Sequence, residues 1–240
     1  MHKKISFRIQ PDERITIINT TGSGKTTTIK LLNRSYDIQK GSIKVGGVDV
    51  REWDLKALRQ HIGVVLQDVF LFSGNVRDNL AMGAPSVPME RIEAAARSAN
   101  AERFISRLAE GYQAPVRERG SNFSVGQRQL LSLARVLVSQ PEILVMDEAT
   151  SSVDTETEAL IQDALEKVMR GRTCLLIAHR LSTIRNADRI IVMHHGEVRE
   201  MGSHAELMEK QGIYYRLYQL QYEREELKLA ANDDIVKLHA

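Results

Sequence analysis

TTGSGKTT, at residues 20–27, restricts the possible folds of this chain more than any other stretch. It follows the apolar run ITII, residues 15–18, and the residues after it have helical character. A glycine-rich turn between a buried strand and a helix lets the backbone fold closely around phosphate, and its N–H groups attract anions. The stretch therefore nearly matches a phosphate loop, with Lys25 reaching the β- and γ-phosphates and Thr26 binding Mg²⁺. The residues predicted to bind ATP here are Asn19, Thr20, Thr21, Gly22, Ser23, Gly24, Lys25, Thr26 and Thr27.

One position departs from the motif, because Asn19 stands where its first glycine is expected. Asn tolerates left-handed backbone geometry better than most residues, so we expect mild strain in the loop and a possible weakening of nucleotide binding. A turn that merely joins a strand to a helix is the alternative interpretation. GSGKTT directly after an apolar strand is specific enough to disfavour it.

A second site signal is the run ILVMDE, residues 143–148, an apolar strand that ends in two carboxylates. An unpaired charge at the end of a buried strand is costly, so such a pair calls for a reason. In phosphate-loop enzymes an acid at this place holds Mg²⁺, which we predict for Asp147, with Glu148 as the general base that polarises the attacking water. The alternative is an acidic pair that caps a helix, and the phosphate loop upstream disfavours it.

The bulk properties exclude several classes of protein. The chain has 240 residues and a formal net charge of +2, and this balance argues against a protein whose main task is to grip nucleic acid. The single cysteine, Cys174, rules out an intramolecular disulfide and suits a reducing compartment. No run reaches the about 18 apolar residues needed to span a bilayer.

Hydrophobic patterning predicts an α/β fold. Strands are expected at residues 5–9 and 15–18 and at the start of IGVVLQD, residues 62–68, with hairpins around Gly46-Gly47 and within residues 188–202. The apolar runs ending at Asp147 and His179, separated by the helical stretch 155–169, indicate buried parallel strands. We predict a P-loop NTPase (RecA-like) parallel-sheet core at about residues 1–85 and 141–220, an inserted helical subdomain at about 86–140, some antiparallel strands, and a helical tail at about 204–240.

Further along the chain, FSVGQ at residues 123–127 resembles the LSGGQ signature of the nucleotide-binding domains of ABC transporters. The resemblance spans roughly residues 5–220 and looks closest to the exporter branch, on the strength of ERG before this signature segment and of IAHRLSTIRNADRI at residues 177–190. It implies that this segment meets the γ-phosphate of ATP held by an opposite subunit. Val125 replaces a glycine and Phe123 a leucine, so an altered fit is expected. The residues carried over to ATP binding are Ser124, Gly126 and Gln127.

The same resemblance assigns roles to four other segments. Gln67 matches the Q-loop, which contacts Mg²⁺ and senses the transport partner, and His179 matches the switch histidine near the γ-phosphate. Residues 151–154, SSVD, match the D-loop, and residues 117–120, RERG, resemble the X-loop of exporters. The resemblance thus implies catalytic roles for Glu148, His179 and Gln67 and a metal site formed by Thr26, Gln67 and Asp147.

The resemblance also implies partners. Two such domains, identical or different, would sandwich ATP and Mg²⁺ and couple hydrolysis to export through a transmembrane domain, at the cytoplasmic face of a membrane and without nucleic acid. The aromatic residue that stacks on adenine would lie upstream of Met1, so the chain is expected to be truncated, and Phe7 is expected in the core. Two alternatives stay open: a module that binds ATP and dimerises with little turnover, and a soluble ATPase acting on DNA ends or ribosomes. The second is disfavoured because the chain has neither coiled-coil arms nor a basic stripe.

Overall fold

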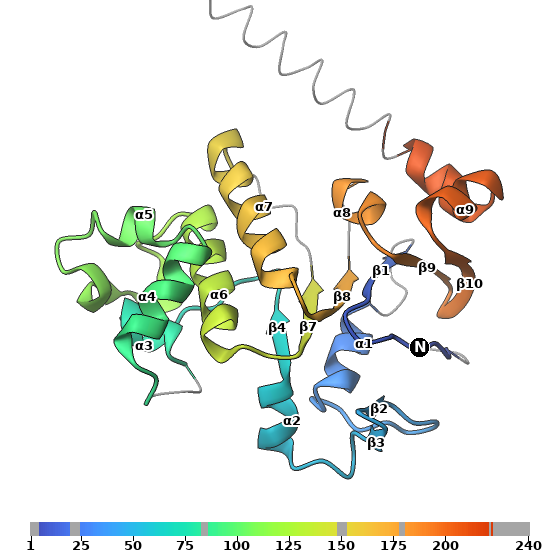
Figure 1. The fold of residues 1–240 in the computed structure, drawn as a ribbon, viewed down its shortest axis with the longest axis horizontal. Coiled ribbons are helices and arrows are strands. Elements are labelled where there is room, and N and C mark those ends of the chain that lie inside the picture. The colour runs from blue at the N-terminus through green and yellow to red at the C-terminus, as the bar shows by residue number, and fades with distance from the viewer. Residues whose placement is uncertain are drawn as a thin grey trace, which may run out of the picture. The chain divides into compact units, whose positions relative to one another are not determined.

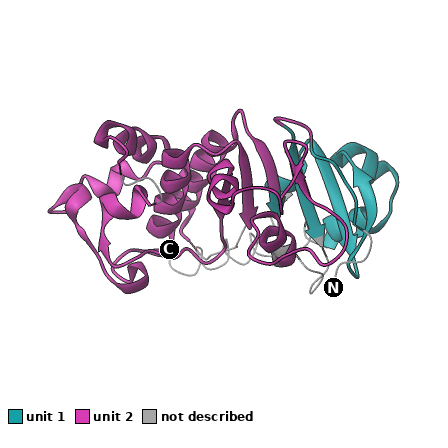
Figure 2. Ribbon diagram, turned by 90° about the horizontal axis from the view of Figure 1, so that it is seen from below, with its two compact units in different colours: residues 1–9, 13–25, 176–240 teal, residues 10–12, 26–175 magenta. Residues whose placement is uncertain are grey.

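The computed structural model describes most of the chain (Figure 1). The described residues are 5–19, 25–82, 86–147, 153–177, 181–220 and 222. The chain forms two compact units (Figure 2): unit 1 takes residues 1–9, 13–25 and 176–240, and unit 2 takes residues 10–12 and 26–175.

Unit 1 is a small sheet with helices from the second half of the chain. Its strands are hydrogen-bonded in the order β10-β9-β1, followed by the end of β8. β1 and β9 run parallel, with Ile15 opposite Arg189, and β9 and β10 form an antiparallel hairpin. The central apolar residues of β1 and β9 are buried, as expected of strands covered on both faces, whereas β10 has no buried residue. The elements are β1 (Arg14–Asn19), α8 (Leu181–Arg185), β9 (Arg189–His194), β10 (Glu197–Gly202) and α9 (His204–Glu209).

The core of unit 1 joins this sheet to the helices after it. Its buried members are Ile18, Ile184, Ala187, Ile190, Val192, Leu207 and Tyr214. The helical residues 213–220 are tied to β10 by Glu200, whose carboxylate accepts the backbone N–H groups of Ile213 at 2.6 Å and Tyr214 at 3.0 Å. A carboxylate at a helix N-terminus satisfies donors that have no partner within the helix.

Unit 2 contains the rest of the sheet and most of the helices. Its strand order is β8-β7-β4, and β4 and β7 run parallel, with Ile62 opposite Ile143. Two short antiparallel pairs, β2–β3 and β5–β6, lie outside this sheet. The elements are α1 (Lys25–Leu32), β2 (Lys44–Val45), β3 (Val48–Asp49), α2 (Leu55–His61), β4 (Ile62–Val65), β5 (Gly74–Asn75), α3 (Val76–Leu80), α4 (Met89–Ser98), α5 (Glu102–Ile105), η1 (Gly111–Gln113), β6 (Pro115–Val116), η2 (Glu118–Gly120), α6 (Val125–Ser139), β7 (Ile143–Asp147), α7 (Thr155–Met169) and β8 (Thr173–Ile177), of which α1 begins and β8 ends in unit 1.

The helix α6 is the centre of the helical part of unit 2. It packs against α3, α4 and α7, which surround it in Figure 1. Leu130, Leu131, Leu133 and Ala134 are buried on it, so most of its circumference faces protein. A helix that is buried on most of its sides lies inside a fold rather than on its surface.

Most expected elements are confirmed, and one is wrong. The buried strands at 15–18, 143–147 and 173–177, the helix at 155–169 and both hairpins are present. Residues 5–9 form no strand. Their exposure alternates as expected, but the carbonyl of Arg8 accepts a hydrogen bond from the Arg189 guanidinium rather than taking part in a strand ladder. Phe7 is half-buried rather than in the core.

Candidate functional site

The predicted phosphate loop is described only at its two ends. Asn19 is the last residue of β1, and Lys25, Thr26 and Thr27 begin α1. The loop residues Thr20, Thr21, Gly22, Ser23 and Gly24 lie outside the described residues, as do Glu148, residues 151–152 and His179. The order of a buried parallel strand, a short connection and a helix is the one that a phosphate loop requires.

Two predicted residues follow or end neighbouring strands at the carboxyl edge of the unit 2 sheet. Asp147 is the last residue of β7, after the buried Leu144 and Val145. β4 is its parallel neighbour, with Val65 opposite Met146, and the exposed Gln67 follows β4 by two residues. Parallel strands present their carboxyl ends at one edge, where ligands of such sheets bind. Both side chains offer hard oxygen donors, the kind that Mg²⁺ prefers, so the described residues fit the ion.

The signature segment, residues 123–127, forms the start of α6. Ser124 is the N-cap: its hydroxyl accepts the N–H of Gln127 at 3.1 Å, and the Gln127 side-chain oxygen accepts the N–H of Ser124 at 3.0 Å. This reciprocal pair is a capping box. Both side chains that the resemblance assigns to ATP are therefore bonded to the segment's own backbone here. ATP binding by Ser124, Gly126 and Gln127 stays a prediction.

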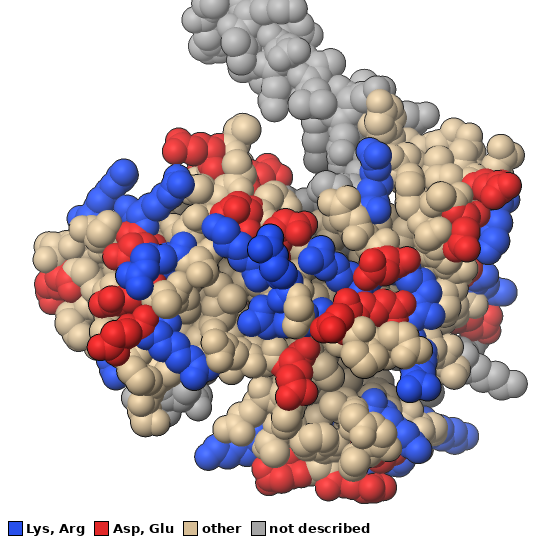
Figure 3. All heavy atoms as spheres, viewed as in Figure 1, with Lys and Arg blue, Asp and Glu red and all other residues tan. Residues whose placement is uncertain are grey.

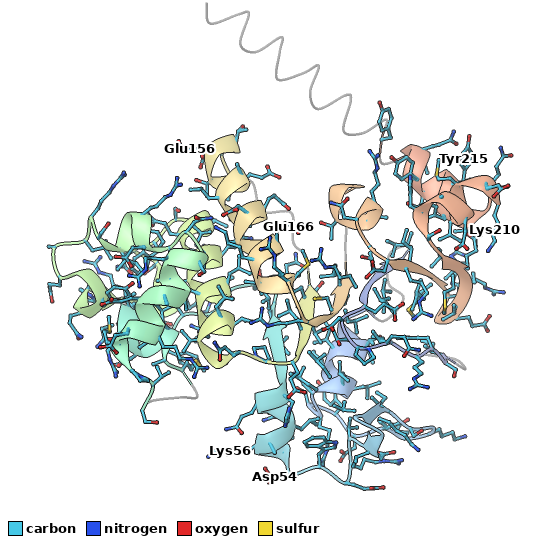
Figure 4. All side chains as sticks on the ribbon, in the orientation of Figure 1. Asp54, Lys56, Glu156, Glu166, Lys210 and Tyr215 are labelled. Atoms are coloured by element: carbon cyan, nitrogen blue, oxygen red, sulfur yellow. The ribbon has the colours of Figure 1, made fainter. Side chains whose placement is uncertain are left out.

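The described end of the D-loop forms the start of α7. The Asp154 carboxylate accepts the N–H of Thr157 at 2.9 Å and so caps this helix. This bond and one from the Thr157 hydroxyl hold the pKa of Asp154 below its ordinary value. The side chains of Glu156 and Glu158 add negative charge to the first turn and Lys167 adds positive charge to the last, both favourable to the helix dipole. The labels of Glu156 and Glu166 mark this helix in Figure 4.

A buried polar network that sequence reasoning missed holds the segment after Gln67 in place. Asn79, 3% exposed, receives the N–H of Phe72 at 2.8 Å and donates to the Phe72 carbonyl at 2.8 Å. Arg135 of α6 donates to the carbonyls of Asn79 at 2.8 Å and Phe70 at 3.2 Å, and burial lowers its pKa. The only sequence signal is an arginine inside the apolar run of α6.

This network presents two aromatic rings outward. Phe70 and Phe72 are each 48% exposed, and their ring centroids lie 4.8 Å apart in an edge-to-face arrangement. Between them Leu71 is buried beside Gly120, in the segment that resembles the X-loop. Gly120 has a φ of +66°, and a Cβ there would lie 2.7 Å from Leu71 Cδ1. Glycine is therefore required where these two segments meet.

Charge does not single out another site on the face drawn in Figure 3, where Lys and Arg alternate with Asp and Glu. In the part of the chain that the structure describes, no helix is both long enough and apolar enough to cross a membrane.

Comparison with known proteins identifies this arrangement. The family described as "ABC transporter" matches residues 2–151. A Bacillus subtilis (strain 168) protein named "Uncharacterized ABC transporter ATP-binding protein YknV" is 49% identical over 91% of this chain and 36% of its own length. The "ATP-dependent lipid A-core flippase" of Syntrophus aciditrophicus (strain SB) is 46% identical over 94% of this chain and 37% of its own length.

A solved structure agrees. "Structure of a bacterial Atm1-family ABC exporter with ATP bound" matches with a TM-score of 0.84 and 39% identity, over 90% of this chain and 38% of that chain. The chain thus spans about a third of the length of the relatives it matches. Its fold is the predicted P-loop α/β fold, and by sequence and structure the chain belongs to the ABC transporter family, as an ATP-binding domain whose relatives include exporters.

Proposed function

We propose that this chain binds ATP with Mg²⁺, hydrolyses it to ADP and phosphate, and drives export through a transmembrane domain. One observation carries the proposal: the glycine-rich residues 20–24 connect the end of a buried parallel strand, β1, to the start of α1. That connection supports a phosphate site, because N–H groups at a turn and at a helix N-terminus bind anions. ATP binding is general to the family, and the roles of individual residues are proposed for this chain.

The proposed chemistry divides among the predicted residues. The phosphate loop, with Lys25, holds the phosphates, and Thr26, Gln67 and Asp147 hold Mg²⁺, which neutralises charge on the phosphate oxygens. Glu148 takes a proton from the attacking water, and His179 lies near the γ-phosphate. Water adds to the γ-phosphorus, and the bond from that phosphorus to the β–γ bridging oxygen breaks, so that ADP leaves with this oxygen and inorganic phosphate is formed.

The signature segment supplies the other half of the proposed site. A second ATP-binding domain, identical or related, would present its own Ser124 equivalent across the nucleotide. A ligand that bridges two subunits promotes their association by mass action. The neutral first turn of α6 supports this role, because no acidic side chain there would repel a phosphate.

Coupling to a membrane partner is the further part of the proposal. Relatives named ATP-binding/permease proteins, a lipid A-core flippase and a fatty acid transporter support a transmembrane domain and a place at the cytoplasmic face of a membrane. The exposed Phe70 and Phe72 offer an apolar contact for it. We also propose that residues 86–140 act as the helical subdomain that meets this partner, between core segments at about 1–85 and 141–220. The proposed function does not involve nucleic acid.

Replacing the proposed general base tests the proposal. Glu148→Gln keeps the size of the side chain and removes its basicity, so steady-state ATP hydrolysis by the intact protein should fall by about 10²–10⁴-fold. ATP affinity should stay within about threefold of the wild-type value, because a general base contributes to the chemical step rather than to binding. Glu166→Gln, an exposed position on α7, is the control and should hydrolyse ATP at the wild-type rate. Unchanged hydrolysis by Glu148→Gln would refute the role.

A second candidate is a module that binds ATP and dimerises with little turnover. Asn19 favours it, since it stands where the phosphate loop's first glycine is expected and strain there would slow turnover. Measuring ATP affinity and turnover on the same preparation separates the two. Tight binding with turnover indistinguishable from buffer would favour the second candidate.

A further inference from the structure

The start of α6 touches the start of α7 at a glycine. A Cβ atom placed on Gly126 would lie 2.1 Å from the Thr157 methyl carbon, Cγ2, and 3.6 Å from Val153 Cγ1. Real Cβ atoms essentially never approach another heavy atom to less than 3.0 Å. Gly126 is buried, whereas the neighbouring Val125 is 39% exposed. The missing side chain of this glycine therefore faces its own chain.

Thr157 is held in the orientation that creates this contact. Its N–H donates to the Asp154 carboxylate at 2.9 Å, and its hydroxyl helps to lower the pKa of the same carboxylate. With the hydroxyl directed to Asp154, the methyl group is left to face Gly126. The two ends of one small side chain thus contact the D-loop and the signature segment.

We propose that Gly126 is a glycine because of Thr157, and that Thr157 is a positioning residue that sets the spacing between the signature segment and the D-loop. The usual reason for a glycine in a phosphate-contacting turn is close approach of the ligand. Here the occupied direction is intramolecular. The consequence for ATP turnover rests on the proposed function, whereas the contact itself does not.

The contact between Gly126 and Thr157 sets a minimum distance between the start of α6 and the start of α7. Protein interiors are close-packed and therefore transmit small displacements. An added methyl group at position 126 would therefore move α6 or α7. A displaced signature segment would meet the partner's nucleotide less well. This loss should raise the ATP concentration at half-saturation more than it lowers the rate at saturation.

Compensating substitutions in the intact protein test the proposal. Gly126→Ala should lower ATP turnover at sub-saturating ATP by about tenfold or more and lower Tm by about 2–8 °C, the range expected of a strained core. Adding Thr157→Ser removes only the clashing methyl and keeps the hydroxyl for Asp154. The double variant should recover turnover to within about threefold of wild type and most of the lost Tm.

A matched control isolates the methyl group. Gly126→Ala with Thr157→Val keeps a methyl directed at position 126 and should remain as impaired as Gly126→Ala alone. Thr157→Ser alone should raise the half-saturating ATP concentration by about threefold with little change at saturation, because it loosens the spacing without introducing a clash.

Two results would overturn the proposal. Recovered Tm without recovered turnover in Gly126→Ala with Thr157→Ser would mean that the ligand requires the glycine. An unchanged Tm in Gly126→Ala would mean that the contact is not tight. If the wild-type protein hydrolyses no ATP, the proposed function fails, and the four Tm values still decide whether Thr157 dictates the glycine.

Discussion

Two helices of this chain begin with the same hydrogen-bond motif and differ in one atom's chemistry. In α6 of unit 2, Ser124 and Gln127 form a capping box, and in α9 of unit 1, Ser203 and Glu206 form another. The Ser203 N–H donates to the Glu206 carboxylate at 2.8 Å, and the Glu206 N–H donates to the Ser203 hydroxyl at 3.3 Å. The two capping boxes share their hydrogen-bond geometry, but the side chain of Gln127 in α6 is neutral and that of Glu206 in α9 is negatively charged.

The difference separates a structural helix start from one that has to receive a ligand. A carboxylate at the third position is favourable for a helix taken alone, because it complements the dipole. α9 uses that gain, and α7 gains in a similar way from Glu156 and Glu158 on either side of its third position. α6 has no acid in its first turn. A neutral cap keeps the helix start attractive to phosphate, as the proposed ATP site requires.

Replacing the capping box of α6 by the acidic type found in α9 should have the largest effect on ATP turnover. Gln127→Glu retains the hydrogen bonds and adds one negative charge where the partner's γ-phosphate is proposed to lie. We expect ATP turnover to fall by about 100-fold, which corresponds to roughly 3 kcal/mol of charge repulsion. Tm should stay equal or rise slightly, because the helix dipole favours the acid. Steady-state ATPase assays and thermal unfolding of the same samples check both parts.

The reverse exchange is the control for that prediction. Glu206→Gln gives α9 the box of α6 and should leave ATP turnover at the wild-type value, since α9 has no proposed part in the site. A Gln127→Glu variant that turns over ATP normally would contradict the idea that α6 is kept neutral for a ligand.

The capping box of α6 illustrates which features of the site could be predicted from the sequence. The resemblance assigned Ser124 and Gln127 to ATP, and the S-x-x-Q spacing that makes them partners of each other is a local pattern readable in the sequence. The buried strands and α7 were likewise predictable, because apolar runs and helical periodicity are local signals. The strand predicted at residues 5–9 failed because a strand also needs a hydrogen-bonded neighbour.

Other features depend on contacts between distant segments. The network of Asn79 and Arg135 joins residues 56 apart in the sequence, and no local pattern announces it. The same holds for Gly126 and Thr157. Asp147 and Gln67 lie at one sheet edge because β4 pairs with β7, which the order of elements alone does not establish.

Removing the serine from each box should separate stability from function. Ser124→Ala and Ser203→Ala each delete one cap hydrogen bond, so each should lower the free energy of unfolding by about 0.5–2 kcal/mol, as measured by urea denaturation. Only Ser124→Ala should also lower ATP turnover, by about tenfold. Equal turnover losses in the two variants would mean that the effect is one of stability alone.

Low pH should weaken the capping box of α9 and leave that of α6 unchanged, and this is the smallest of the expected effects. The backbone N–H of Ser203, with its hydroxyl, holds the pKa of Glu206 below its ordinary value of 4.5. A depressed pKa in the folded state contributes stability above the unfolded pKa, and that contribution is lost as pH falls through the folded pKa. Amide hydrogen exchange in α9 should therefore accelerate below about pH 4.5, beyond any change in the intrinsic exchange rate. The start of α6, where neither Ser124 nor Gln127 titrates, should show no such component. Glu206→Gln should abolish it in α9, and if the acceleration persists in that variant, the carboxylate is not its cause.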